Sequence, residues 1–399
     1  MNLPERLGVN RIVLALSVAR LADALGNSMM IIVLPLYVAV LPARILNLPP
    51  TLLIGVLISS YGLINIIAQP LMGALSDRFP KRKPMIIVGL LLMSAATLSF
   101  ILADQFSHLL LSRMVQGVGV AMAVPATLAL ITAATVRGTR GSSMGLYSTM
   151  RLVGFSVGPL LAGLLYDLYG FLAVFLVGGG MVLLSTLLVF IWVDESDLVP
   201  QEKPVEIKPF QIFDRAIWSP EIIGLGAATV SMALAYSMMA ALENEFNARL
   251  DQTALGFGLA FSALTIGRML VQVPLGRLSD RIGRKPVIIA GLIAMAPATA
   301  SLGLVGSTLA LAIARFMQGI ASAAIASPAL ALVGDVSPVG GEARQMSVIT
   351  TGFFVGTTLG PLIAGGLAVY SFELPFVVGG LLSLVGALIV QTRVSEAPR

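Results

Sequence analysis

Long apolar stretches separated by short polar turns run along almost the whole chain. Most of these stretches reach about 18 residues or more, which is the length that a helix needs to cross the hydrocarbon core of a bilayer. The pattern predicts an all-α membrane protein with transmembrane helices at 12–41, 51–72, 84–103, 109–135, 143–165, 171–193, 219–242, 253–275, 286–305, 308–333, 345–368 and 374–391.

One longer polar segment, 194–218, divides these twelve helices into two sets of six. It carries charges of both signs and is interrupted by Pro200, Pro204 and Pro209, a composition typical of a linker. We therefore expect an N-terminal six-helix bundle at 1–193, a cytoplasmic linker at 194–218 and a C-terminal six-helix bundle at 219–399.

Composition supports a membrane location and excludes several kinds of site. Hydrophobic residues make up 57% of the chain and charged residues only 11%, whereas soluble domains carry roughly 25% charged residues. The net charge of +5 comes from basic residues in short loops, so it does not indicate nucleic acid as a partner. There is no cysteine and a single histidine, His108. We expect no metal site, no cofactor and no enzymatic activity.

The distribution of lysine and arginine predicts the orientation. Most basic loop residues lie on the side of the loop at 73–83, while Arg44 and Arg249 are those on the opposite side. Cytoplasmic loops of membrane proteins carry the excess of positive charge. The chain is thus expected to sit in the cell (inner) membrane, surrounded by lipid, with both termini cytoplasmic.

The two predicted bundles repeat the same motifs in register. The loop GALSDRFPKRK at 73–83 returns as GRLSDRIGRK at 276–285, so that Asp77 matches Asp280 at an offset of 203 residues. At the same offset Asn65 and Gln69 match Arg268 and Gln272. At an offset of 202, the pairs that match are Arg113 with Arg315, Gln116 with Gln318, Gly158 with Gly360, and Pro159 with Pro361. The pattern predicts a duplicated bundle.

With these motifs the sequence resembles the major facilitator superfamily over essentially its whole length. The loop at 276–285 fits the family pattern G-x-L-[AS]-D-R-x-G-R-[RK] completely, while Pro80 replaces a glycine in the first copy. The helix with Arg113 and Gln116 looks like the family's fourth helix. The glycines around Pro159 are similar to the motif of the twelve-helix drug:proton antiporters, although the motif recurs around Pro361. The resemblance implies a central cavity, alternating access and a monomeric protein.

The repeated loops and glycine motifs are candidate conformational elements. A carboxylate at Asp77 or Asp280 could latch onto a helix N-terminus of the opposite bundle, or the loops could act only as topogenic positive charge. The glycine–proline motifs could bend as gates, or could simply allow close helix packing. The latch and gating candidates are Gly73, Asp77, Arg78, Gly158, Pro159, Gly276, Asp280, Arg281, Gly360 and Pro361.

Asp23, in the first predicted helix, is the candidate for proton coupling. An acidic residue at membrane depth is costly unless it is paired or protonated, and is a functional candidate by default. Arg20 and Asn27 share its helix face, and Arg113 with Gln116 on the fourth helix could pair with it. The alternatives are a carboxylate that gains and loses a proton as the bundles move, and a static ion pair holding two helices.

The remaining polar residues inside the predicted helices are candidates for the substrate pathway. They are Asn27, Tyr37, Asn65, Gln69, Arg151, Tyr236, Arg268, Gln272, Arg315 and Gln318. Intramembrane arginines outnumber intramembrane acids, which leans toward an anionic, zwitterionic or neutral substrate unless the arginines only bond helix-end carbonyls. Glu243 and Glu245 suggest a gate, a second protonation site or a solvated helix end.

The function that this sequence favours is proton-coupled efflux of a small organic compound or drug by a secondary active transporter. Uptake or exchange of an organic anion is the alternative, and a membrane sensor that does not transport is a third reading. A primary pump is disfavoured because the chain has no G-x-x-x-x-G-K-[ST] loop for nucleotide phosphates.

Overall fold

The computed structural model describes residues 10–41, 48–79, 81–135, 139–196, 219–336 and 342–395. Within these ranges the regular secondary structure is helical throughout. The α-helices are α2 (Arg11–Val40), α3 (Pro50–Arg78), α4 (Lys83–Ser99), α5 (Phe106–Ala133), α6 (Arg140–Trp192), α7 (Pro220–Ser237), α8 (Glu243–Leu250), α9 (Ala254–Ile282), α10 (Arg284–Ala300), α11 (Thr308–Val336), α12 (Glu342–Leu367) and α13 (Leu374–Arg393). Short 3₁₀ turns extend α4, α7 and α10.

Helix α6 contains two of the predicted membrane spans. It runs for 53 residues, and Gly170 in its middle has φ 75° and ψ −168°. A residue with a Cβ rarely adopts this backbone conformation, so glycine is what allows the chain to break its helix here without a loop. The predicted spans 143–165 and 171–193 fall on either side of this break. Eleven described helices are long and apolar enough to cross a membrane, and with α6 crossing twice they confirm the prediction of twelve spans.

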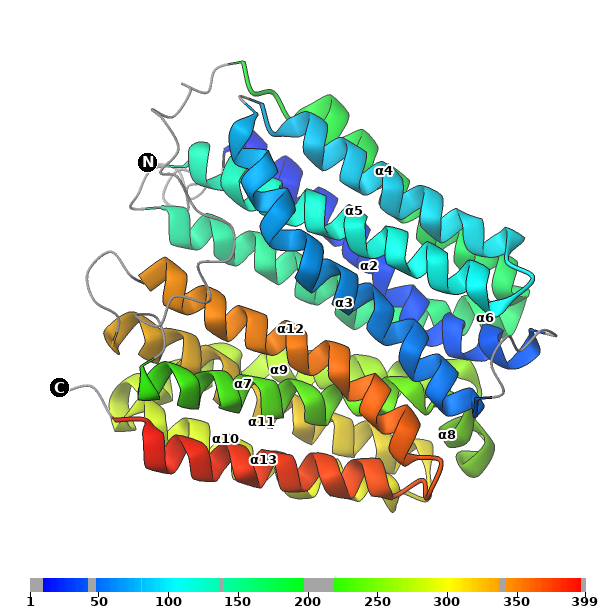
Figure 1. The fold of residues 1–399 in the computed structure, drawn as a ribbon, viewed down its shortest axis with the longest axis vertical. Helices are drawn as coiled ribbons and strands as arrows, with labels where there is room; N and C mark the ends of the chain where they lie inside the picture. Colours follow the sequence, from blue (N-terminus) through cyan, green and yellow to red (C-terminus); the bar gives the residue numbers. More distant parts are fainter. Residues whose placement is uncertain are drawn as a thin grey trace. The chain divides into compact units, whose positions relative to one another are not determined.

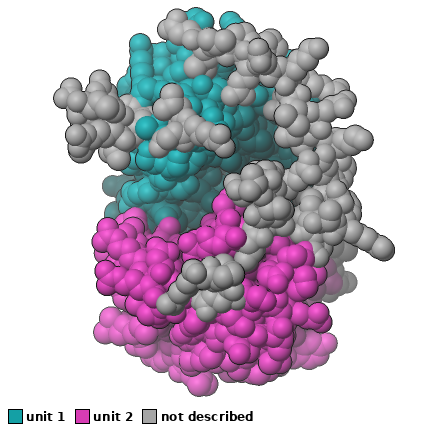
Figure 2. Space-filling model, turned by 90° about the vertical axis from the view of Figure 1, so that its left-hand side faces the viewer, with its two compact units in different colours: residues 1–33, 41–45, 63–210 teal, residues 34–40, 46–62, 211–399 magenta. Residues whose placement is uncertain are grey.

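The chain forms two compact units, which Figure 2 draws in different colours. Unit 1 comprises residues 1–33, 41–45 and 63–210, and unit 2 comprises residues 34–40, 46–62 and 211–399. The C-terminal end of α2 and the first half of α3 thus belong to unit 2. There, Thr51 Oγ1 donates to the carbonyl of Gly365 at 3.0 Å, and Ser59 donates to the carbonyl of Thr358. The expected domain limits at 193 and 219 remain a prediction, and most of the expected linker, 197–218, lies outside the described residues.

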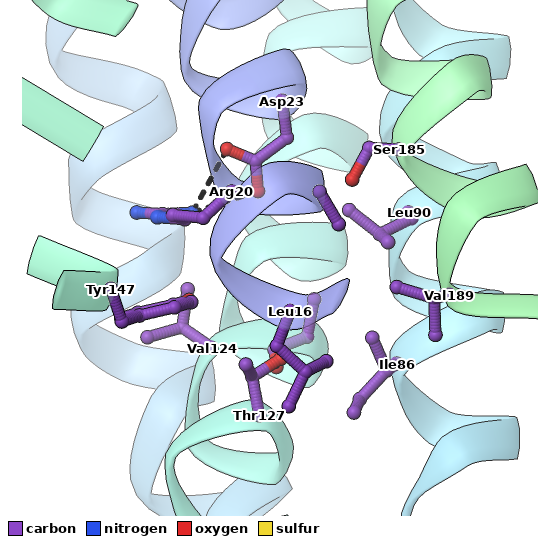
Figure 3. Close-up of a pocket in the computed structure, with 12 residues that line it drawn as sticks. Leu16, Arg20, Asp23, Ile86, Leu90, Val124, Thr127, Tyr147, Ser185 and Val189 are labelled. Atoms are coloured by element: carbon purple, nitrogen blue, oxygen red, sulfur yellow. Dashed lines mark hydrogen bonds and ion pairs between the residues drawn. The ribbon is translucent and has the colours of Figure 1, made fainter. Parts of the chain in front are cut away.

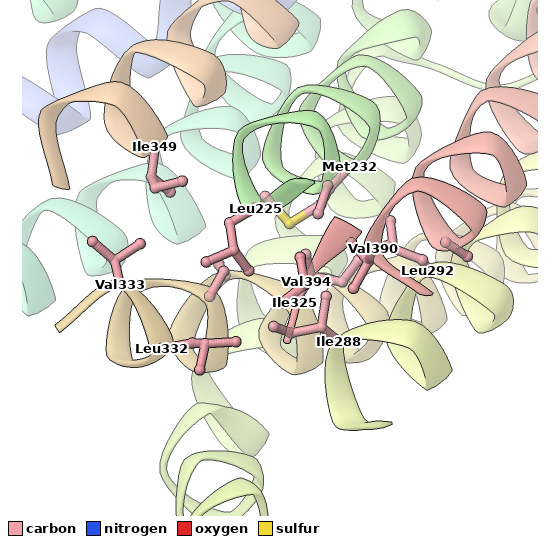
Figure 4. Close-up of a cluster of buried hydrophobic side chains, with 14 of the residues drawn as sticks. Leu225, Met232, Ile288, Leu292, Ile325, Leu332, Val333, Ile349, Val390 and Val394 are labelled. Carbon is pink, nitrogen blue, oxygen red and sulfur yellow. The ribbon is translucent and has the colours of Figure 1, made fainter. Parts of the chain in front are cut away.

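Within each unit the helices run lengthwise beside one another, as Figure 1 shows for α7, α10, α11 and α13. The interior of unit 2 is a cluster of apolar side chains from these helices, among them Leu225, Met232, Ile288 and Val390 (Figure 4). Large apolar residues also cover the outside, and Leu388 is 64% exposed. Helices that are apolar on both their inner and outer faces are those of a protein surrounded by lipid.

Candidate functional site

Asp23 lies in the middle of α2 and is paired on its own helix. Arg20 Nη1 donates to Asp23 Oδ2 at 2.9 Å and to Oδ1 at 3.1 Å, and both side chains are only 9% exposed. The residues are three apart, which places them on one face of the helix. The Arg20 guanidinium also lies over the ring of Tyr147 on α6, 5.5 Å from the ring centre. A buried carboxylate is therefore compensated by a cation that is itself held by a ring.

A small cavity adjoins this ion pair inside unit 1. It leaves about 10 Å³ of room, close to what one water molecule needs. Its walls come from α2, α4, α5 and α6, and its polar lining consists of Arg20, Asp23, Thr127, Tyr147 and Ser185 (Figure 3). The Ser185 hydroxyl is buried and makes no hydrogen bond to any described residue. The site thus combines a carboxylate, a cation and hydroxyl groups around a space of water size, which are the components of a proton-binding site.

Arg113 and Gln116 form a second polar group in unit 1. Arg113 Nη1 donates to Gln116 Oε1 at 2.8 Å, and Gln116 Nε2 donates in turn to Thr97 Oγ1 on α4 at 2.7 Å. All three side chains are buried. The contacts that the structure gives to Asp23 are with Arg20, so the expected pairing of Asp23 with Arg113 remains a prediction.

Unit 2 repeats this network with matching residues. Arg315 Nη1 donates to Gln318 Oε1 at 2.7 Å, and Gln318 Nε2 donates to Thr299 Oγ1 on α10 at 2.8 Å. Arg315 Nη1 also donates to the backbone carbonyl of Tyr236 on α7 at 2.7 Å, and the guanidinium lies 5.0 Å from the ring centre of Phe261. Arg315 and Gln318 are fully buried.

The glycine–proline motifs are sites of close helix packing in both units. Ser28 Oγ on α2 donates to the carbonyl of Gly154 at 3.2 Å, and Ser237 Oγ on α7 donates to the carbonyl of Gly356 at the same distance. One turn along, a Cβ added to Gly158 would collide with Ser28 Oγ, and one added to Gly360 would collide with Ser237 Oγ. Glycine is therefore required for α6 to approach α2, and for α12 to approach α7. These contacts support the packing alternative, and a gating role of Pro159 and Pro361 remains a prediction.

The matched contacts also show what unit 2 lacks. Ser28 corresponds to Ser237, so the position of Asp23 on α2 corresponds to Met232 on α7 and that of Arg20 to Thr229. Met232 is fully buried in the apolar core. Among the residues that the structure describes, a counterpart of the Arg20–Asp23 pair is therefore absent from α7 of unit 2.

The loop motifs differ in how much of them the structure describes. In the second copy, Arg284 at the start of α10 donates to Asp280 at 3.4 Å and forms an ion pair with Asp335 at the end of α11. Asp280 and Arg281 are exposed, and Gly276 has open space beside it. In the first copy Gly73 packs loosely near Pro125, and the side chains of Asp77 and Arg78 lie outside the described part of the chain. The latch contacts would join the two units and remain predictions.

The predicted pathway residues are distributed over both units. In unit 1, Asn65 is buried, Asn27 and Gln69 are half-buried, and Arg151 lies 5.3 Å from the ring centre of Phe155. Arg151 is also within electrostatic range of Asp23. In unit 2, Tyr37, Tyr236, Arg268 and Gln272 are each half-buried. Whether these residues line one pathway is a prediction.

The acids after α7 lie on the short helix α8. Glu243 is fully buried, and burial raises the pKa of the Glu245 carboxyl above its ordinary value. Arg249 at the end of this helix donates to Glu373 at 2.9 Å, an exposed ion pair. The Glu373 pKa is lowered, first by a hydrogen bond from its own backbone amide and then by Arg249. The alternative of a solvated helix end therefore fits Arg249 and Glu373, which are exposed. It does not fit Glu243, which is buried.

Sequence reasoning missed several residues that complete these networks. They are Thr97, Thr299, Ser28, Ser237, Tyr147 and Ser185. The repeat contains a signal for Thr97 and Thr299, because they are 202 residues apart, the same offset as the two arginine–glutamine pairs. Ser28 and Ser237 are 209 residues apart, so that offset does not find them. Tyr147 and Ser185 carry no such signal, since only the packing of α6 brings them to Asp23.

Two helical units in a membrane, each with the same buried arginine–glutamine–threonine network, define a transporter built from repeated halves. The chain belongs to the Major Facilitator Superfamily, whose model matches residues 16–246 and again residues 222–399. It is a multi-pass membrane protein of this transporter family, and the family is one that carries small substrates across the bilayer rather than one of enzymes.

Several of the relatives are named as multidrug transporters. The chain is 29% identical to the multidrug resistance protein MdtG of Serratia proteamaculans, over 84% of this chain and 82% of that protein. It is 25% identical to the multi-drug resistance efflux pump PmrA of Streptococcus pneumoniae, over 79% of each. Among solved structures, a bacterial homolog of the human lysosomal transporter Spinster matches with a TM-score of 0.77, covering 96% of both chains at 15% identity. This structural similarity shows that the chain has the same fold as that transporter.

Proposed function

We propose that this protein exports a small organic compound in exchange for protons, and that Asp23 carries the proton. The observation that supports this most directly is the Asp23 carboxylate, which is buried in a transmembrane helix beside a cavity of water size. An acid at this depth either binds a proton or needs a cation. Arg20 supplies that cation on the same helix face. The names of the relatives favour a drug-like substrate.

In the proposed cycle, protonation of Asp23 neutralises the charge that Arg20 compensates, while Arg20 stays against the ring of Tyr147. Release of the proton restores the ion pair. Because Arg20 and Asp23 are on one helix, movement of the two units does not separate them. Coupling instead requires that the cavity next to the pair open to one side of the membrane at a time.

The other parts of the proposed transport cycle are supported by the repeated sequence motifs and by the distribution of basic residues. Asp77 and Asp280 latch the cytoplasmic side, the two halves divide at the 194–218 linker, and both termini face the cytoplasm of a bacterial-type inner membrane. The protein acts as a monomer, with protons and the organic substrate as its only partners besides lipid.

The test is transport into proteoliposomes with and without a pH gradient, across a panel of cationic, neutral and anionic compounds. We expect accumulation of at least one compound to depend on the gradient and to collapse with a protonophore. Transport that is unaffected by the gradient for every compound would contradict the proposal.

A second candidate function is uptake or exchange of an organic anion. The observation that favours it is the pair of arginines in unit 2, the half-buried Arg268 and the fully buried Arg315, for which the described structure provides no carboxylate. In the same assay, anion exchange without any dependence on the pH gradient would favour this function.

A further inference from the structure

One edge of the Arg315 guanidinium has no hydrogen-bond partner among the described residues. Its Nη1 donates two hydrogen bonds, one to the carbonyl of Tyr236 and one to Gln318 Oε1. Nε and Nη2 are buried and make no hydrogen bond to any described residue. These two nitrogens form the side of a guanidinium that binds both oxygens of a carboxylate or phosphate at once. The contacts to Nη1 thus orient the arginine and leave its bidentate edge available.

Arg268 is a second cation on the neighbouring helix α9. Its Nε is buried and makes no hydrogen bond to any described residue. Phe261, Arg268 and Gln272 follow one another at spacings of seven and four residues, so they share one face of α9. Phe261 on this face lies under Arg315, and the Tyr236 side chain is within electrostatic range of both arginines. The two cations therefore belong to one region of unit 2.

No carboxylate of the described part of unit 2 compensates these charges. Those whose side chains are described lie at helix ends or in α8: Glu221, Glu243, Glu245, Asp251, Asp280, Asp335 and Glu373. The position on α7 that corresponds to Asp23 is the apolar Met232. At the position of Arg268, α3 of the other half has the neutral Asn65. The second cation and the missing acid are thus both particular to the second half.

We propose that Arg315 and Arg268 bind the oxyanion, a carboxylate or a phosphate, of an amphipathic organic substrate. The apolar body of that substrate would lie against the aromatic side chains nearby, where Tyr236 contacts Phe353 with ring centres 6.0 Å apart and Phe353 contacts Phe354. Arg315 is fully covered, while Arg268, Phe261 and Tyr236 are part-exposed. In the proposed mode an oxyanion meets Arg268 first, because Arg268 is the more accessible of the two arginines. In this proposal unit 1 binds the proton and unit 2 binds the charged group of the substrate.

This inference rests on the proposed function and names its substrate class, but its test needs no transport. Binding is measured by calorimetry on the full-length protein in phosphatidylcholine nanodiscs, without any gradient. The probes share one tail: octanoate, octyl phosphate, octanol and octylamine, with inorganic phosphate as the head group alone. We expect both oxyanion probes to bind at least tenfold more tightly than octanol and octylamine.

Two variants test the residues. Arg315→Lys keeps the charge and loses the bidentate edge, and Arg268→Gln removes the part-exposed charge. Each should weaken octanoate and octyl phosphate at least tenfold without changing octanol binding. Arg249→Gln, which removes an exposed arginine of the same unit, is the matched control and should leave the affinity for every probe unchanged. If Arg315→Lys does not fold, as judged by gel filtration and thermal unfolding, Arg268→Gln decides alone.

A further arm distinguishes two sources of the oxyanion. Adding phosphatidylglycerol to the nanodiscs weakens octyl phosphate binding if a lipid head group occupies the site, and leaves it unchanged if the site takes free amphiphiles. Equal affinity of the wild type for all four head groups, or an equal loss for all four in the arginine variants, would overturn the proposal. Such a result would leave proton-driven export of neutral or cationic compounds standing.

Discussion

Arg20 donates to both carboxylate oxygens of Asp23 from one turn earlier on the same helix. A partner on the same helix stays beside the carboxylate whatever the two units do. Under the proposed function, Arg20 therefore stays next to Asp23 throughout the cycle, and the element that changes is the cavity beside the pair. This differs from a carboxylate paired with an arginine of another helix, whose separation a helix movement could change.

The first prediction concerns the counter-ion. Arg20→Gln leaves the ionised form of Asp23 without its cation, so releasing the proton becomes the difficult step. We expect gradient-driven export at neutral pH to fall at least tenfold and its pH profile to move to higher pH. Arg20→Lys keeps the charge and should retain most of the activity. Equal losses in both variants, with an unmoved profile, would mean that Arg20 serves packing alone.

The second prediction uses the repeated polar network. Thr97→Val removes the hydroxyl that accepts from Gln116, and Thr299→Val removes the one that accepts from Gln318. Each leaves a buried amide donor unsatisfied, which costs about 1–3 kcal/mol of stability. Thermal unfolding of the purified protein should show similar losses for the two variants. Thr392→Val, at an exposed helix position, is the control and should unfold at the wild-type temperature.

The third prediction concerns the glycine motifs. Gly158→Ala and Gly360→Ala place a methyl group onto Ser28 and Ser237, and such overpacking typically costs about 1–3 kcal/mol. Removing the hydroxyl as well, in Gly158→Ala with Ser28→Ala, should restore part of the loss because the colliding atom is gone. Gly180→Ala has nothing within 4 Å of the added methyl and should be neutral or slightly stabilising. Additive effects of the two substitutions in the double variant would contradict the contact.

The fourth prediction is a pH dependence of stability. Burial raises the Glu245 pKa above its ordinary value of 4.5. Folded protein therefore keeps a proton that unfolded protein has lost, so this residue lowers stability as the pH rises from about 4.5 through the raised pKa. Glu245→Gln should remove that decrease, seen in unfolding temperatures between pH 4 and pH 8.

Glu373 serves as a control, because its contribution to stability depends on pH with the opposite sign. Its pKa is lowered, so its contribution is present above pH 4.5 and is lost as the pH falls through the lowered value. Glu373→Gln should therefore reduce stability at neutral pH and have no effect at the acid end. The same pH profile in Glu245→Gln and wild type would contradict the burial of Glu245.

The helices were predictable because membrane spans are specified by length and hydrophobicity alone. Even the break at Gly170 falls between two predicted spans. The repeat of motifs predicted the matched arginine–glutamine pairs Arg113–Gln116 and Arg315–Gln318, since duplicated halves place duplicated residues alike. What a span pattern does not contain is the rotation of each helix about its axis, and that decides which polar residues meet.

Asp23 shows the consequence of that limit. Its spacing from Arg20 was visible in the sequence, but Arg113 was an equally reasonable partner, and the sequence contains nothing that ranks the two. Tyr147 and Ser185 come from the two halves of α6, which only folding brings to α2. The same applies to Arg315, whose orientation depends on a backbone carbonyl of Tyr236 that no side-chain pattern reveals.

The most direct test of the account is proton movement at Asp23 itself. Substrate is added to proteoliposomes with a trapped pH-sensitive dye, for wild type and for Asp23→Asn, with Ser28→Ala as a control on the same helix. The account predicts a substrate-induced proton flux in wild type and in the control, and none in Asp23→Asn, which should still exchange labelled for unlabelled substrate. An undiminished proton flux in Asp23→Asn would contradict it.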